Sequence, residues 1–223
     1  MGVQFPAGVL VRTGAERAAL VRRTYALVFV SVLFTIAGAT FALSQPLLLQ
    51  AVAEHPILSM IAAFAPLLVV TRARNAFPAN IGLVLLFTFV MGVISSPVLY
   101  VYGRTQPGLI TQAAVLTIGA FGVLTLYAFV SRRDFSAWGS FFIMGLWVLI
   151  GTMFLNFYFR NPAMDLWLAG ITVLVFSGLL IFDTWRIRNV YGPDEYVLAA
   201  VNIYLDLLNI FMGILRVLGG RRS

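Results

Sequence analysis

Residues 171–218 read ITVLVFSGLLIFDTWRIRNVYGPDEYVLAAVNIYLDLLNIFMGILRVL, and this stretch decides the class of fold. Two long apolar runs are separated by Gly192-Pro193, a pair typical of a helix end followed by a new helix start. The first run begins upstream at Met164, so each run is about long enough to cross the hydrocarbon core of a bilayer, which takes about 20 residues. The stretch predicts a tight hairpin of two membrane helices, with Pro193, Asp194 and Glu195 in the first turn of the second helix.

The rest of the chain repeats this pattern of apolar runs and short polar gaps. Of 223 residues, 61% are hydrophobic and 10% are charged, whereas a soluble domain carries about 25% charged residues. We predict an all-α polytopic membrane protein with a seven-helix domain at 25–218, a cytoplasmic segment at 1–24 and a short tail at 219–223. The predicted spans are Tyr25–Leu43, Ala51–Val70, Ala79–Val101, Leu109–Val130, Trp138–Tyr158, Met164–Phe182 and Val197–Leu218.

The first apolar run has an alternative interpretation as a secretory signal. Arg22-Arg23 precede it, and Ala37-Gly38-Ala39 has the small-x-small form of a cleavage site. The polar lead is long for a signal peptide, however, and the apolar residues continue past Ala39 to a full spanning length. The pattern therefore favours a transmembrane helix.

Composition excludes several classes of membrane protein. Without lysine the chain cannot form a retinal or pyridoxal Schiff base. Without cysteine it has no disulfide, thiolate metal site or cysteine-held iron–sulfur cluster, and a single histidine, His55, excludes paired-histidine haem and zinc sites. We predict no cofactor.

Arginine placement predicts the orientation, because cytoplasmic loops carry the positive excess. With the N-terminus in the cytoplasm, the outer loops hold only Arg104 and Arg160, and ten arginines fall inside: Arg12, Arg17, Arg22, Arg23, Arg72, Arg74, Arg132, Arg133, Arg186 and Arg188. Seven complete spans would place the arginines at 216, 221 and 222 outside, against the rule. The net charge of +7 reflects topology and attraction to the lipid bilayer, and we predict no nucleic-acid partner.

Two acidic residues lie at membrane depth in the predicted hairpin. An ionisable group there costs about 2.5–3.5 kcal/mol even on lenient insertion scales, so it marks a candidate functional site. Counting from Gly192, Asp183 lies nine residues back and Asp206 fourteen forward, an axial offset of about 7.5 Å that tilt or crossing could absorb. The two carboxyl groups are predicted to approach one another in the cytoplasmic half of the bundle.

Two interpretations of these acids stay open at this point. In the first, contact prevents both from ionising, so the pair shares a proton or a cation and acts as a pH sensor or a calcium site. In the second, Asp183 pairs with Arg186 on its own helix and Asp206 hydrogen-bonds Asn or Tyr side chains, both as structural contacts.

The last predicted span carries a polar stripe: Asn202, Asp206, Asn209 and Gly213 share one helical face. In lipid such a face must meet protein or water, which predicts a central position for this seventh helix. In the third span, the segment Gly92-Val-Ile-Ser-Ser-Pro97 predicts either an unwound turn that lines a cavity or close helix packing. The candidate pore-lining residues are Asn202, Asn209, Gly213 and Pro97.

Several of these segments closely resemble those of the Bax inhibitor family, also called transmembrane Bax inhibitor motif proteins. The most specific are Phe182-Asp-Thr184 and Tyr204-Leu-Asp-Leu-Leu-Asn209, and the similarity extends to segments 92–97, 111–122 and 131–136. It covers most of the chain from the third span onward, whereas the first 70 residues match only in hydropathy. The Arg-only, Ala- and Gly-rich usage indicates a bacterial member in the inner membrane.

The resemblance implies a pH-sensitive calcium leak and no enzymatic activity, with calcium as the permeant ion. It assigns the roles of sensor and gate to Asp183 and Asp206, which would also be the calcium ligands. It further implies that an arginine at the cytoplasmic end of the second helix, Arg72 or Arg74, latches onto the pair in the closed state. Some relatives carry an acidic residue within the second span, and this chain has none there.

Two alternatives compete with the channel. A non-conducting scaffold that binds partner proteins predicts that neutralising either aspartate changes stability without changing ion flux. An intramembrane aspartyl protease would use the pair as general acid and base. Such proteases resemble one another in a Gly-x-Gly-Asp signature, and here Ile203-Tyr204-Leu205 precede Asp206.

Overall fold

The computed structural model describes residues 14–72, 79–159 and 161–220, and all regular secondary structure in these ranges is α-helical. Six of the described helices are long and apolar enough to cross a membrane, and a bent helix pair brings the total to seven if it counts as one span. The chain is therefore a polytopic all-α membrane protein, as predicted. The helices are α1 Gly14–Leu43, α2 Pro46–Glu54, α3 Pro56–Arg72, α4 Ala79–Thr105, α5 Leu109–Val130, α6 Ser136–Phe159, α7 Pro162–Asn189 and α8 Tyr196–Gly220.

The predicted second span, Ala51–Val70, is wrong as one continuous helix. Helix α2 ends at Glu54, α3 begins at Pro56, and the two are bent by 100°. Pro56 has no N–H to continue the first helix, and it drives the preceding residue away from helical dihedrals. His55 accordingly has φ −122° and ψ 59°. Glu54, His55 and Pro56 interrupt the apolar run at this point, but hydropathy averaged over a spanning length does not reveal so short an interruption.

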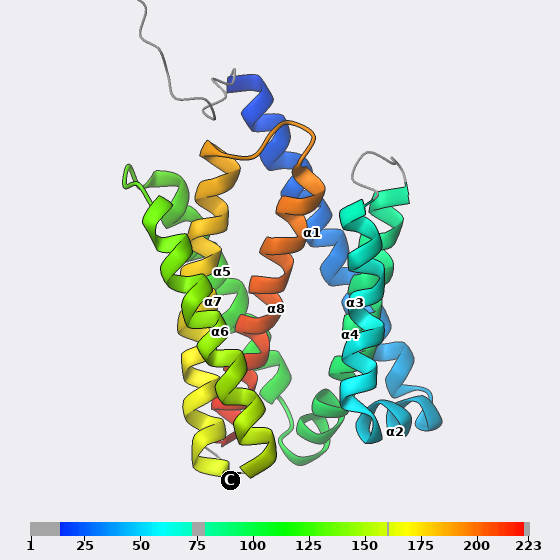
Figure 1. Cartoon of the computed structure of the whole chain (residues 1–223). Coiled ribbons are helices and arrows are strands. Elements are labelled where there is room, and N and C mark those ends of the chain that lie inside the picture. The colour runs from blue at the N-terminus through cyan, green and yellow to red at the C-terminus, as the bar shows by residue number, and fades with distance from the viewer. Residues whose placement is uncertain (1–13, 73–78, 160, 221–223) are drawn as a thin grey trace, which may run out of the picture. The chain divides into compact units, whose positions relative to one another are not determined.

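The described helices group into two compact units (Figure 1). The first contains α5, α6, α7 and α8 with the first turns of α1, up to Val21, and the second contains the rest of α1 with α2, α3 and α4. In the first unit α7 packs against α5, α6 and α8, and α8 also packs against α5. Helix α8 is the most buried of the six long helices, in agreement with the prediction that its polar stripe faces protein.

Helices α6 and α7 interlock through two glycine–phenylalanine contacts. Gly139 of α6 lies against the ring of Phe182, and Gly178 of α7 lies against the ring of Phe142, so close that any side chain at either glycine would overlap the ring. Each glycine thus provides the space that a phenylalanine of the other helix fills. This packing fixes the segment of α7 next to Asp183.

In the second unit, α1 and α4 approach backbone to backbone at Gly38 and Gly92. A side chain at either position would overlap the main chain of the opposite helix, and the Thr35 hydroxyl donates to the Thr88 carbonyl at 3.0 Å. Small residues permit this close approach in membrane helices. Of the two interpretations of segment 92–97, the structure supports close packing.

Helix α4 continues through Pro97 without an unwound turn. Proline cannot donate to the carbonyl four residues earlier, which here belongs to Val93. The Ser96 hydroxyl donates to that carbonyl instead, at 2.7 Å. The serine therefore satisfies the group that the proline would leave unpaired inside the membrane.

Candidate functional site

The turn between α7 and α8 brings the two predicted acids into reach of one another. Helix α7 ends at Asn189, and the backbone N–H groups of Val190 and Tyr191 both donate to the Arg186 carbonyl. The Gly192 N–H then donates to the Glu195 carboxylate at 2.6 Å, and α8 begins at Tyr196. The predicted helix start at Pro193 is therefore three residues early, because Glu195 folds back to close the turn before the helix begins.

Asp183 and Asp206 meet across the hairpin, one from α7 and one from α8. Their carboxyl groups lie close enough to interact and to share a hydrogen bond when one is protonated, and they are almost fully buried, with 7% and 3% of each residue exposed. An ionised carboxylate only accepts hydrogen bonds, so this contact requires a proton on one of the two groups. The approach predicted from the residue count is therefore present, and it depends on protonation.

Asp183 also forms the ion pair that the structural interpretation predicted. Arg186 Nη1 donates to Asp183 Oδ1 at 3.0 Å. Asp183 therefore makes the predicted ion pair and also faces Asp206, and the role of the pair as a pH sensor or calcium site stays a prediction. For Asp206 the expected Asn or Tyr partner is not found, because its Oδ2 is buried with no hydrogen-bond partner among the described residues.

Arg186 is held by two aromatic rings as well as by Asp183. Its guanidinium lies 4.5 Å from the ring centre of Tyr191 and 5.6 Å from that of Phe182, within the range of cation–π attraction. The Tyr191 hydroxyl accepts a hydrogen bond from the Asn202 side chain at 2.7 Å, which links the turn to α8. Burial raises the pKa of Tyr191, and the nearby Asp183 charge adds to the rise, so this phenol remains neutral.

Tyr191 is the residue of this site that sequence reasoning missed. It lies in the turn rather than in a span, and nothing in its spacing distinguishes it from an interfacial tyrosine. Only 2% of it is exposed, although it adjoins the polar turn. Its position joins Arg186 of α7 to Asn202 of α8.

The charges at the site balance with one proton. Two carboxyl groups that share a proton carry one negative charge, and Arg186 supplies one positive charge. Removing the proton leaves a net negative charge in a nearly water-free position, where it is costly unless a cation compensates it. The arrangement can therefore exchange a proton for a cation.

The other predicted pore-lining residues have different surroundings. Asn202 is engaged by Tyr191, and the Asn209 side chain donates to the Leu205 carbonyl of its own helix at 2.8 Å. Gly213 lies against α7, where an added Cβ would come within 2.7 Å of the Val173 side chain. Pro97 belongs to the second unit. Whether any of them lines an ion path stays a prediction.

The two latch candidates lie outside what the structure describes. Arg74 falls between the described ranges, and Arg72 is the last residue of α3 with a side chain that is not described. Their predicted contact with the acid pair stays a prediction.

The acid pair does not form a closed metal site. No group of three or more His, Cys, Asp or Glu side chains that could hold a metal ion occurs in residues 14–72, 79–159 and 161–220. Calcium takes about six to eight oxygen ligands, of which two carboxyl groups supply at most about four. A pair of this kind fits brief contact with a calcium ion better than tight retention.

Comparison with known proteins places these residues in context. The family described as "Inhibitor of apoptosis-promoting Bax1" matches residues 17–223. Protein lifeguard 4 of Mus musculus is 32% identical over 91% of this chain and 85% of its own, and Bax inhibitor 1 of Schizosaccharomyces pombe is 33% identical over 91% and 77%. An uncharacterised protein of Helicobacter pylori is 28% identical over 92% of this chain and 88% of its own.

Proposed function

The chain belongs to the Bax inhibitor family, and from that premise we propose that it is a calcium leak channel whose opening depends on pH. The observation that carries the proposal is the approach of Asp183 and Asp206, two buried acids on adjacent helices that need a shared proton to form a hydrogen bond with one another. Arg186 neutralises the remaining charge of the pair. The protonation state thus decides whether α7 and α8 attract or repel one another at this point.

The proposed gate works through the charge balance of the pair. With one proton the site is neutral and the hydrogen bond holds the two helices together. A change in protonation removes either that hydrogen bond or the ion pair with Arg186, and it biases an equilibrium between two arrangements of the hairpin. A guanidinium from elsewhere in the chain would compensate the deprotonated pair, a role that we assign to Arg72 or Arg74.

Calcium is the proposed permeant ion because the site offers only hard oxygen ligands. Asp183 and Asp206 carry the carboxylates. The Asn202 and Asn209 side chains contribute amide oxygens on α8, the helix of Asp206. Too few ligands are present to hold the ion firmly, and conduction requires binding that is weak enough for the ion to leave. We place the channel in a bacterial inner membrane with its N-terminus in the cytoplasm.

Calcium flux into liposomes tests the proposal. The full-length protein is reconstituted with an internal calcium dye, and uptake is measured from pH 5 to pH 8 for wild type, Asp183→Asn and Asp206→Asn. Asp194→Asn is the matched control, because Asp194 is an exposed acid in the turn between the same two helices. The proposal expects pH-dependent flux in wild type and in Asp194→Asn, and an altered dependence in both variants of the pair.

The same experiment separates the competing functions. If folded wild-type protein conducts no calcium at any pH, the proposal of a calcium channel is wrong. A change in thermal stability without any flux would then favour the scaffold. Cleavage of a reconstituted helical peptide that both aspartate variants abolish would instead identify an aspartyl protease.

A further inference from the structure

We propose that a basic pocket beside the loop between α5 and α6 binds the phosphate group of an anionic membrane lipid. The pocket has a volume of about 300 Å³, and its lining includes Ser131, Arg132, Arg133, Asp134, Trp185 and Arg188. It lies wholly within the first unit, between the α5–α6 loop and the end of α7. Nothing in the proposed calcium pathway uses these residues.

Arg188 forms the fixed part of the pocket. Its Nη1 donates to the carbonyl oxygens of Ala128, Phe129 and Ser131 at 2.9, 2.8 and 3.1 Å, which orients the guanidinium at the end of α5. The other guanidinium nitrogens make no hydrogen bond within the described residues, and no acidic side chain there pairs with Arg188. A guanidinium held in this way has N–H groups left to donate to phosphate oxygens.

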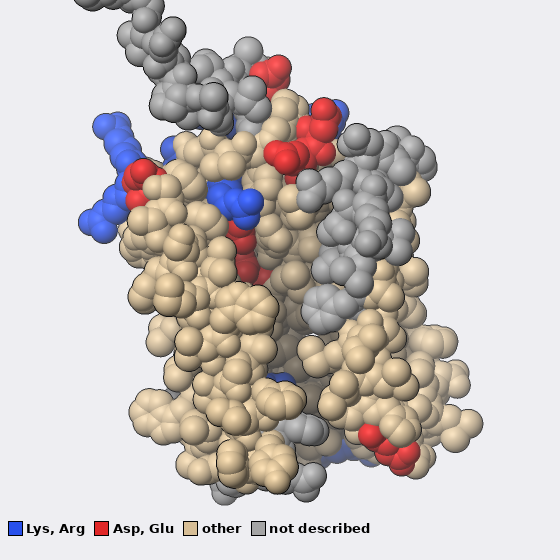
Figure 2. Space-filling view, viewed as in Figure 1, with Lys and Arg blue, Asp and Glu red and all other residues tan. Residues whose placement is uncertain are grey.

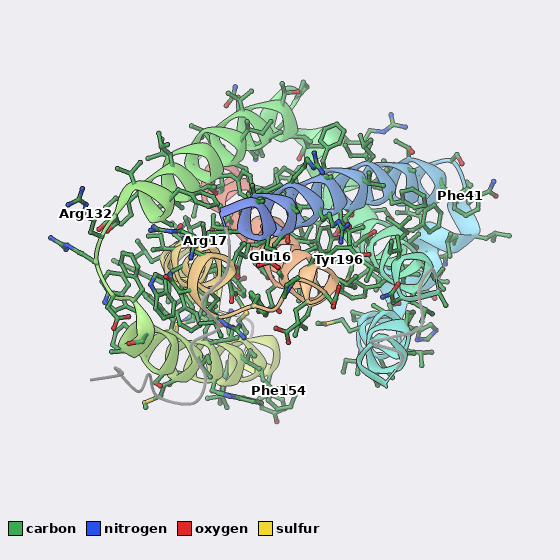
Figure 3. The ribbon with its side chains drawn as sticks, turned by 90° about the horizontal axis from the view of Figure 1, so that it is seen from above. Glu16, Arg17, Phe41, Arg132, Phe154 and Tyr196 are labelled. Atoms are coloured by element: carbon green, nitrogen blue, oxygen red, sulfur yellow. The ribbon has the colours of Figure 1, made fainter. Side chains whose placement is uncertain are left out.

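Arg132 and Arg133 supply the exposed part of the charge. Both are exposed, and neither side chain makes an ion pair or hydrogen bond in the part of the chain that the structure describes. Figure 3 shows Arg132 at the periphery of the loop, extended away from the helices. The acid in the lining, Asp134, accepts the Ser136 backbone N–H at 2.8 Å. Three guanidinium groups against one engaged carboxylate favour an anion.

The neighbouring surface identifies the source of that anion as a lipid. Val130, the last residue of α5, is 71% exposed and apolar, and the charged residues follow immediately after it. Trp138 is exposed near the start of α6, and Trp185 lines the pocket itself. Tryptophans mark the level of the lipid headgroups. Figure 2 shows the same boundary, with charged side chains gathered at this end of a broad uncharged surface over α6 and α7.

Native mass spectrometry of the full-length protein in detergent tests the proposal. The probes are phosphatidylglycerol, phosphatidylcholine and inorganic phosphate, each added to wild type, to the double variant Arg132→Gln/Arg133→Gln and to Arg188→Lys. Wild type is expected to retain phosphatidylglycerol in preference to phosphatidylcholine. The double variant should lose about tenfold or more of that preference, because each basic residue near an anionic lipid contributes substantially to attraction. Arg188→Lys keeps the positive charge but removes the planar guanidinium with its several N–H donors. This variant should stay folded and bind phosphatidylglycerol more weakly.

Arg104→Gln is the matched control. Arg104 is an exposed arginine in the last turn of α4, before α5 begins, whereas the pocket lies after α5 ends. Equal retention of the two lipids by wild type would overturn the proposal. So would a double variant that behaves like wild type, or an equal loss in Arg104→Gln, which would show an effect of net charge alone. Binding of inorganic phosphate at the same concentration as the lipid would overturn the assignment to a lipid and identify a site for free phosphate.

Discussion

Helix α7 carries an acidic residue near each end, and the two are accommodated in opposite ways. Asp165, in the first turn, accepts a hydrogen bond from the Asn156 side chain of α6 at 2.5 Å. Asp183, near the other end, faces a second carboxyl group and an arginine. The first acid meets an amide that donates at every pH, whereas the second meets, besides Arg186, a carboxyl group that donates only when one of the two acids is protonated.

The difference distinguishes an acid with a permanent amide donor from the acid to which we assign the proposed switch. Asn156 also accepts the Asn161 backbone N–H through its Oδ1 at 3.2 Å, so its amide joins α6 to the start of α7. The N-terminus of a helix favours a negative charge as well. At the other end, Asp206 Oδ2 is buried with no partner among the described residues. The acid at the first end has an amide as its partner, and the contact between the two acids at the other end depends on a proton.

Replacing an acid at each end gives the largest expected contrast. In Asp206→Asn, a permanent amide donor replaces the shared proton, so the calcium flux should vary by less than about twofold between pH 5 and pH 8, whereas a titrating wild type varies by about tenfold or more. Asp165→Asn should keep the wild-type profile. Liposome flux measures both. A flat profile in Asp165→Asn would remove the distinction between the two ends.

Removing the amide at the first end should affect stability instead. Asn156→Ala leaves Asp165 and the Asn161 N–H without their partner, which should cost about 1–2 kcal/mol of unfolding free energy. Thermal unfolding in detergent, followed by tryptophan fluorescence, measures the loss. Asn209→Ala is the control, because that side chain bonds only a carbonyl of its own helix. If Asn156→Ala changed the pH profile of calcium flux, the role of Asp165 and Asn156 at the start of α7 would not be purely structural.

Arg186→Gln tests the role assigned to the acid pair near the C-terminal end of α7. Without the guanidinium, the acid pair loses the positive charge that favours its ionised form. The pH dependence of calcium flux should therefore move upward by about one unit. The variant Arg132→Gln, which removes an arginine elsewhere in the same unit, should leave the dependence in place. A downward shift in Arg186→Gln would contradict the charge balance proposed for the site.

Tyr191→Phe should have the smallest effect. It removes the hydroxyl that accepts from Asn202 and keeps the ring over Arg186, so it should cost about 1 kcal/mol of stability and leave the flux profile unchanged. Tyr191→Leu removes the ring too and should shift the profile in the direction of Arg186→Gln. Paired unfolding and flux measurements distinguish the two variants. Identical flux profiles for the two would exclude the ring as the support of Arg186.

The sequence predicted the acid pair because its geometry is local. A short turn fixes the axial positions of both helices, so counting from Gly192 sufficed to bring Asp183 and Asp206 together. The i, i+3 contact of Asp183 and Arg186 follows from the same helical geometry. The seven spans could be predicted equally directly from the apolar runs, except at Pro56. There, averaged hydropathy conceals a break that the proline itself indicates.

Residues that depend on lateral packing were beyond reach of the sequence. Arg188 bonds carbonyls that lie 57 to 60 positions earlier in the chain, and no periodicity connects them. Tyr191 meets Asn202 only because the turn closes through Glu195. In both cases a long polar side chain finds a backbone or amide partner on another element, and many such partners are compatible with one sequence.

The anchoring of Arg188 has a mechanical consequence for the acid pair. Arg188 ties the end of α7 to the end of α5, and the glycine–phenylalanine contacts tie α7 to α6, so these three helices are linked next to Asp183. For the proposed gate, Asp183 is thus held to two other helices, and separating the two acids would require α8 to shift against α7, which it also packs against. Helix α8 in turn meets α7 closely where Gly213 lies against Val173, and the hydrogen-bonded turn at residues 190–195 connects the two helices. The anchoring of Arg188 therefore bears on the proposed gate, because it holds α7, and with it Asp183, to a helix other than α8.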